Sequence, residues 1–150
     1  MSEFLLSIGY GRWILNALLV LPVVGALLTL AVPAARVKHV AFAAALVEFV
    51  VSAGLWWAFD PASAGMQFEF WAPWIPSFGI AYRVGVDGIS LFMILLTTLT
   101  MPLAMLGSWQ YITQRERGFY ALMLVMTTGM LGVFVALDLF LFYVFWEIML

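Results

Sequence analysis

Two glutamates interrupt apolar stretches of this sequence that are long enough to cross a membrane. A charged side chain at the centre of a bilayer costs about 2.5–3.5 kcal/mol even on the milder insertion scales. Glu147 lies beyond Asp138 by about 13 Å of helix, within the aromatic run 139–150. An acid at this depth predicts proton or ion transfer, because ionisable groups inside membranes are retained mainly for function. The alternative is a neutral acid that is hydrogen-bonded between helices.

Glu48 is the second candidate for proton transfer, and its neighbours are small. Ala44 and Ser52 lie one helical turn away on either side, and Ala41 and Ala45 lie close to the same face. Small residues allow helices to approach closely, so we expect Glu48 to face a helix contact rather than lipid. This setting fits a structural hydrogen bond as well as it fits transport, and both interpretations stay open.

The composition places the chain in the membrane. Of 150 residues, 66% are apolar and 9% are charged, whereas soluble domains average about 45–50% and about 25%. The absence of cysteine and the single histidine exclude thiol chemistry, iron–sulfur clusters and a zinc or haem site. The sequence contains no phosphate-binding loop and no nucleophile elbow. We therefore expect an integral membrane protein without a cofactor or metal of its own, and no binding of nucleic acid.

Charged residues divide the chain into apolar segments of membrane-spanning length. About 20 residues of helix cross a hydrocarbon core. The sequence predicts an all-α, polytopic transmembrane protein that forms one domain over residues 1–150. Four full spans are expected near 13–35, 40–59, 88–111 and 118–137, and an incomplete fifth in 139–150. The connector 60–87 is rich in proline and in aromatic residues that suit a membrane interface.

Basic residues predict the orientation of these spans. Arg36, Lys38, Arg115 and Arg117 fall on one side if the spans alternate, and Arg12 and Arg83 fall on the other. The positive-inside rule places the larger group in the cytoplasm and the N-terminus and connector outside. A signal peptide cleaved within 32–35 is the rival interpretation, but its apolar run is too long and its leader is barely basic.

Two aspartates and a set of small residues have structural interpretations. Asp87 and Asp138 each precede an apolar run, where a carboxylate caps the free amides of a helix N-terminus. Thr128, Gly132 and Ala136 recur every four residues. Such a stripe lets a neighbouring helix approach closely.

Four segments of the chain resemble a known family. They are WIPSFGI at 74–80, GVDGISL at 85–91, GSW at 107–109 and ALDLFLFYVFWEIML at 136–150. Together they resemble the antiporter-like membrane subunit M (chain 4) of bacterial NADH:quinone oxidoreductase, respiratory complex I. The resemblance covers about the last 80 residues well and the earlier residues mainly in the order of the spans.

The resemblance implies a subunit that translocates protons, while NADH, FMN, iron–sulfur clusters and quinone are bound by other subunits. It also implies a bacterial inner membrane, with the lipid bilayer and other membrane subunits as partners. In the family, the glutamate of the FWE run is protonatable and pairs with a lysine from a later broken helix. The matching residue is Glu147. The single lysine present, Lys38, is expected in a loop, so the chain resembles only the N-terminal portion of such a subunit.

Two other functions remain open. Subunits of sodium/proton antiporters and of membrane hydrogenases share the FWE-type helix, although the connector over 71–87 favours complex I. A scaffold without transport activity, in which Glu147 is a buried neutral hydrogen-bonding group, belongs to a different class.

Overall fold

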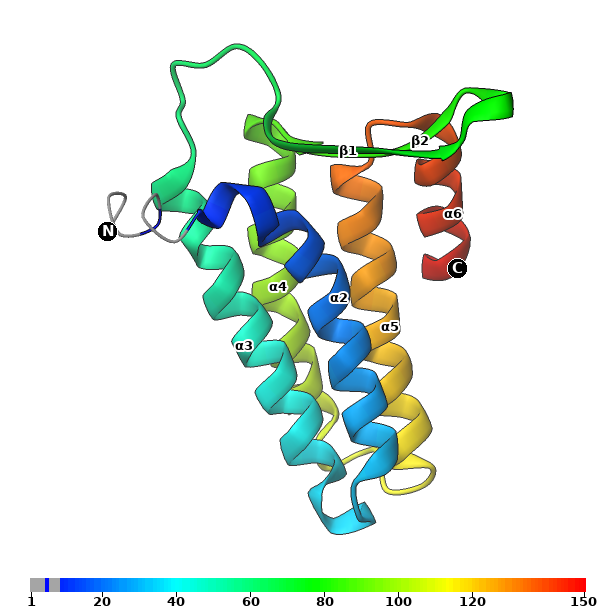
Figure 1. The fold of residues 1–150 in the computed structure, drawn as a ribbon. Helices are drawn as coiled ribbons and strands as arrows, with labels where there is room; N and C mark the ends of the chain where they lie inside the picture. Colours follow the sequence, from blue (N-terminus) through cyan, green and yellow to red (C-terminus); the bar gives the residue numbers. More distant parts are fainter. Residues whose placement is uncertain (1–4, 6–8) are drawn as a thin grey trace.

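The computed structural model describes Leu5 and residues 9–150. Its long helices lie side by side as a bundle, and a shorter helix packs along one of them (Figure 1). The long helices are α2 (Tyr10–Ala31), α3 (Val37–Ala58), α4 (Gly88–Ser108) and α5 (Glu116–Val135), and the short one is α6 (Leu139–Met149). Each long helix has the length and hydropathy of a membrane span. The four predicted helices of membrane-spanning length are therefore confirmed, with ends shifted by a few residues, and the segment 139–150 forms the short apolar helix α6.

Both predicted N-caps are present. Asp87 Oδ1 accepts a hydrogen bond from Ser90 N at 2.7 Å, and Ser90 Oγ accepts one from Asp87 N at 2.9 Å. The side chain of Ser90 helps to hold the pKa of Asp87 below its ordinary value. At α6, Asp138 Oδ1 accepts from Phe140 N at 2.9 Å. Charged carboxylates thus satisfy free amides where α4 and α6 begin.

The connector contains an antiparallel hairpin that the sequence analysis did not predict. Strand β1 (Gln67–Ile75) pairs with β2 (Ile80–Val86), and the 3-10 helix η2 (Pro76–Phe78) joins them. Gly79 follows η2 with a φ of 69°, a conformation that favours glycine. Pro73 lies within β1, which is tolerated because a two-stranded sheet has free edges. The hairpin lies across the ends of α4, α5 and α6 (Figure 1).

Polar contacts fix the hairpin to the helices. The backbone of Leu137 donates to Arg83 O at 2.9 Å, and Ala81 N donates to Asp138 Oδ2 at 3.3 Å. Tyr82 donates its hydroxyl to Asn16 Oδ1 on α2 at 2.7 Å, and burial raises the pKa of Tyr82. Asp138 therefore has a second role, because it ties β2 to the start of α6.

The bundle core divides into two clusters of different character. The hairpin-side cluster is built largely from branched aliphatic residues, whereas the Lys38-side cluster at the opposite end contains small and flexible ones. Fully or almost fully buried members of the first include Ile14, Leu18, Leu55, Ile94 and Leu131. Members of the second include Ala26, Ala41, Ala45, Met101, Met105 and Tyr120. The Lys38-side cluster therefore combines small residues, which allow close helix contacts, with methionines, whose unbranched side chains adapt to their surroundings.

The small residues of α5 face two different neighbours. Gly132 lies against the ring of Phe145 on α6, as the predicted stripe requires. Thr128 instead turns toward α2, where its hydroxyl donates to Leu19 O at 3.2 Å. Gly129 takes the place expected for Thr128, because it meets the backbone of α6 at Met149.

Candidate functional site

Glu48 lies inside the bundle on α3. It is 1% exposed and shares the buried face of α3 with Ala41, Ala45 and Ser52. Neither of its carboxyl oxygens has a hydrogen-bond partner among the described residues. The prediction that Glu48 faces a helix contact is confirmed, whereas the structural hydrogen bond considered for it is absent from the described part of the chain.

A pair of buried hydroxyls lies one turn from Glu48, toward the hairpin. Ser52 Oγ and Thr98 Oγ1 are 2.7 Å apart and join α3 to α4. Both hydroxyls also have carbonyl acceptors on their own helices, Phe49 O at 2.9 Å for Ser52 and Ile94 O at 3.0 Å for Thr98. The sequence analysis recognised Ser52 only as a small residue and did not identify Thr98.

Contacts at other heights place Glu48 against α2 and α4. Gly25 of α2 packs on Ala44, one turn from Glu48 toward the Lys38 end. The antiparallel arrangement then brings the α2 segment 18–22 to the height of Glu48. On α4, the Ser52 to Thr98 contact lies on the hairpin side, so the segment 101–102 lies at the same height. Both segments contain a buried proline.

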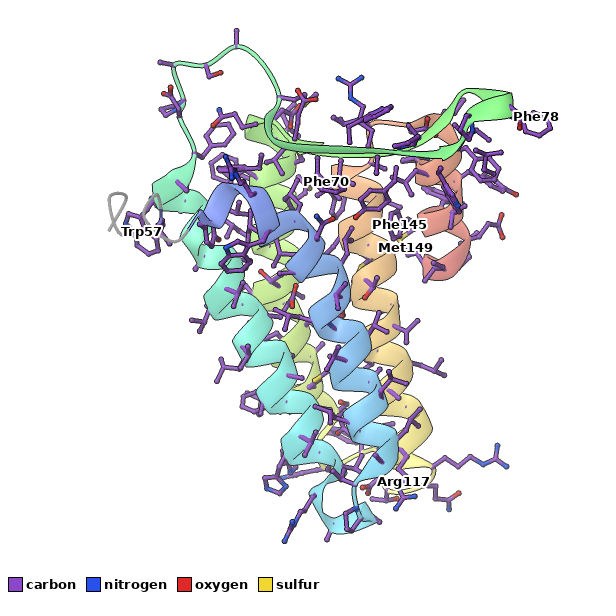
Figure 2. The ribbon with its side chains drawn as sticks, viewed as in Figure 1. Trp57, Phe70, Phe78, Arg117, Phe145 and Met149 are labelled. Carbon is purple, nitrogen blue, oxygen red and sulfur yellow. The ribbon has the colours of Figure 1, made fainter. Side chains whose placement is uncertain are left out.

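Glu147 occupies a different environment. Helix α6 buries Leu141 and Phe145 against α5, and Phe145 and Met149 lie between the two helices (Figure 2). Glu147 is exposed, which places it on the side of α6 that faces away from α5. Tyr143, one turn earlier, interacts with it through its side chain.

The structure does not bring the two acids together, and it places the single lysine elsewhere. Lys38 lies in the first turn of α3 rather than in a loop, because η1 (Ala34–Arg36) already makes the turn from α2. Its ammonium donates to Trp109 O at 2.7 Å and to Ile112 O at 3.0 Å, and it pairs with Glu116 Oε1 at 3.2 Å. Lys38 therefore joins the two turns at its end of the bundle and is not a partner for Glu147.

The contacts of Lys38 could only partly have been found in the sequence. Lys38 and Glu116 stand in polar breaks that the alternation of spans puts on the same side. The backbone carbonyls that Lys38 binds carry no signal in the sequence. Within Leu5 and residues 9–150, no group of three or more histidine, cysteine, aspartate or glutamate residues is arranged to hold a metal ion.

Comparison with known proteins reveals close relatives. The family described as NADH-ubiquinone oxidoreductase chain 4, amino terminus, matches residues 19–136. NAD(P)H-quinone oxidoreductase chain 4 3 of Picosynechococcus sp. is 42% identical over 138 residues, which are 89% of this chain and 25% of that protein. NADH-quinone oxidoreductase subunit M of Rhodobacter capsulatus is 46% identical over 110 residues, 73% of this chain and 21% of that protein.

Solved structures agree with the sequence relatives. A chain of respiratory complex I from Thermus thermophilus with bound NADH matches with a TM-score of 0.73 at 30% identity, over 89% of this chain and 26% of that one. A chain of an archaeal membrane-bound sulfane sulfur reductase matches with a TM-score of 0.75 at 20% identity, over 91% and 21%. The latter likeness concerns the fold alone. The chain spans about a quarter of the length of the relatives it matches.

Proposed function

The chain belongs to the family of NADH-ubiquinone oxidoreductase chain 4, of which it matches the amino-terminal part, and we propose that it forms part of a proton-translocating membrane subunit of an NADH:quinone oxidoreductase. In this proposal, other subunits bind NADH, FMN, iron–sulfur clusters and quinone and carry out the electron transfer. The contribution of this chain is to hold a protonatable group within the membrane. Its partners are the lipid bilayer and the other membrane subunits of the complex.

The position of Glu147 on α6 is the observation that carries the proposal. Its side chain faces away from α5, so a cationic side chain from outside the described bundle can approach it. A lysine close to Glu147 favours the charged carboxylate, and withdrawal of that lysine favours uptake of a proton. Coupling then requires that conformational changes driven by quinone chemistry alter the distance between the two groups.

The packing of α6 on α5 supports this role because it holds Glu147 in one place. Gly129 and Gly132 allow close contact between the helices, and Asp138 fixes the start of α6 to the hairpin. A protonatable group on a rigid element keeps a defined position within the subunit. The displacement that couples to proton uptake is therefore assigned to the partner.

We further propose a bacterial inner membrane, with the Lys38 end in the cytoplasm and the hairpin outside. The distribution of basic residues supports this orientation, because Arg12 and Arg83 belong to the hairpin end and the larger group to the other. The chain has no cysteine, so single cysteines can report the topology. We expect Phe78→Cys, at a position 80% exposed on the hairpin, to react with an impermeant maleimide from outside, and Thr113→Cys only after permeabilisation. The reverse pattern would contradict the orientation.

The function is tested by Glu147→Gln in membrane vesicles that contain the whole complex. Proton uptake driven by NADH is compared with NADH oxidation by an artificial acceptor, which reports assembly. We expect uptake and coupled quinone reduction to collapse while the acceptor rate holds. Glu69→Gln is the matched control, because Glu69 is an exposed hairpin glutamate paired with Arg83 at 3.1 Å. Normal proton uptake in Glu147→Gln would refute the proposed role.

A further inference from the structure

Glu48 is a buried acid, and the segments of the described helices that pack around it contain no basic side chain. Helices α2, α4 and α5 pack against α3. The segments 13–31, 88–108 and 118–135 contain no charged residue, and Tyr120 is their one titratable side chain. The nearest charged groups on these helices therefore lie at the ends of the bundle. The phenol of Tyr10 also lies at one end, where it donates to Val51 O at 2.6 Å. An isolated buried carboxylate is strongly disfavoured, so the protonated acid is the form that this interior accepts.

The backbone at the height of Glu48 offers acceptors rather than donors. Pro22 and Pro102 lie inside α2 and α4, and both are buried. Because proline has no N–H, the carbonyls of Leu18 and Thr98 lose their helical donors. The protons of Ser52 and Thr98 already have acceptors in nearby carbonyls or in each other. A carboxylate at Glu48 would therefore add a further acceptor, and none of these described groups has a free proton to donate to it.

The geometry argues against a purely structural role for this acid. A structural acid stabilises a bundle through hydrogen bonds to neighbouring helices, and a buried polar group without such bonds is a net cost. Neither carboxyl oxygen of Glu48 has such a bond among the described residues. The stability lost by burying Glu48 is therefore not recovered through a hydrogen bond to another of the described helices.

The two halves of the core differ as routes to Glu48. Toward the hairpin, the way is filled by the fully buried Leu55 and Ile94. Toward the Lys38 end the core contains Ala41, Ala45, Met101 and Met105, and the unbranched methionine side chains can rearrange more readily than branched ones. The buried hydroxyl of Tyr120 belongs to this half and, like Glu48, has no hydrogen-bond partner among the described residues.

From these observations we infer that Glu48 is a second proton-binding site, separate from Glu147, which exchanges its proton with water at the Lys38 end by way of the Tyr120 hydroxyl. The step moves one proton from water to a carboxylate oxygen of Glu48 and back, without electron transfer. The use of this proton in pumping rests on the proposed function, whereas its binding does not.

Infrared difference spectroscopy of the assembled complex in its membrane tests the binding. We expect a carbonyl stretch of a protonated carboxyl that shifts in D2O and is lost in Glu48→Gln, but is retained in Glu69→Gln and Glu147→Gln. If Glu48→Gln does not assemble, Glu48→Asp should move the band rather than abolish it. Absence of any band that responds to substitution of Glu48 would overturn the inference.

The route and the use of the proton have separate measurements. We expect Tyr120→Phe to slow deuterium exchange at the Glu48 band severalfold, and unchanged exchange would remove Tyr120 and the Lys38 end from the inference. Glu48→Gln should lower NADH-driven proton uptake severalfold while the artificial-acceptor rate holds. If Glu147→Gln pumps normally and the Glu48 band is present, the proposed function fails but the proton-binding site stands. If Glu147→Gln abolishes pumping and the Glu48 band is missing, the proposed function stands but the proton-binding site at Glu48 fails.

Discussion

The contact between α5 and α6 predicts that Gly129→Ala displaces the helix that carries Glu147. A Cβ at Gly129 would lie 2.8 Å from Met149 N and 3.0 Å from Met149 Cα, whereas ordinary contacts begin at 3.4 Å. The atoms it meets are backbone, so no side-chain rotation relieves the clash. Helix α6 must instead move by roughly half an ångström, and overpacking of this kind costs about 1–3 kcal/mol.

Gly118→Ala on the same helix is the matched control. A Cβ at Gly118 has no neighbour within 4 Å, so the substitution gains helix propensity, about 0.5–1 kcal/mol, without a clash. Because Gly129→Ala makes the same chemical change, the difference between the two variants isolates the clash. We expect Gly129→Ala to be the less stable by about 1–3 kcal/mol.

The assay heats the detergent-solubilised complex and measures how much of this subunit remains soluble. For a chain of this size the expected difference corresponds to several degrees in midpoint temperature. Proton uptake per NADH provides a second readout, since Glu147 lies two residues before Met149 and moves with it. Equal midpoints and equal uptake for the two variants would refute the proposed tight contact between α5 and α6.

Three further outcomes follow from the polar contacts. Lys38→Met should destabilise the subunit by about 2 kcal/mol, because it removes charge-assisted bonds to two loop carbonyls and to Glu116. The same change at the exposed Arg117 should have little effect in a thermal melt, and equal losses would count against the Lys38 contacts. Asp87→Ala should cost about 1 kcal/mol through its cap. Because the pKa of Asp87 is lowered, the stability that its carboxylate contributes is present at neutral pH and is lost below roughly pH 4. If Asp87→Ala loses as much stability on acidification as the native protein does, the role of the Asp87 charge is contradicted. Asp138→Asn should keep part of its cap but loosen the hairpin, which hydrogen exchange at Ala81 N would report, and unchanged protection there would exclude the tie.

The resemblance to the family was carried by sequence that also has clear structural roles. The FWE run lies on α6, and Asp138 is the N-cap of that helix, as the sequence predicts. The family match over residues 19–136 and the relatives confirm the membrane-subunit identification. The functional roles of Glu147 and Glu48 stay predictions.

The sequence by itself determined the membrane class, the number and order of the spans and the caps at Asp87 and Asp138. These properties are local, since hydropathy acts over about 20 consecutive residues and an N-cap depends on the next turn. The hairpin was not predicted because β1 contains Pro73 and irregular pairing, and because contacts to α2 and α6 stabilise it in part.

Only the tertiary structure decided which partner each polar group has. Lys38 found its partners more than 70 positions away, Trp109 O and Ile112 O, and backbone carbonyls leave no trace in residue types. Within Leu5 and residues 9–150, Glu48 has no hydrogen-bond partner, because the residues that neighbouring helices bring to its height are apolar or already bonded. Helix packing, rather than local sequence, therefore places Lys38 at one end of the bundle, Glu48 in its interior and Glu147 on the exposed side of α6.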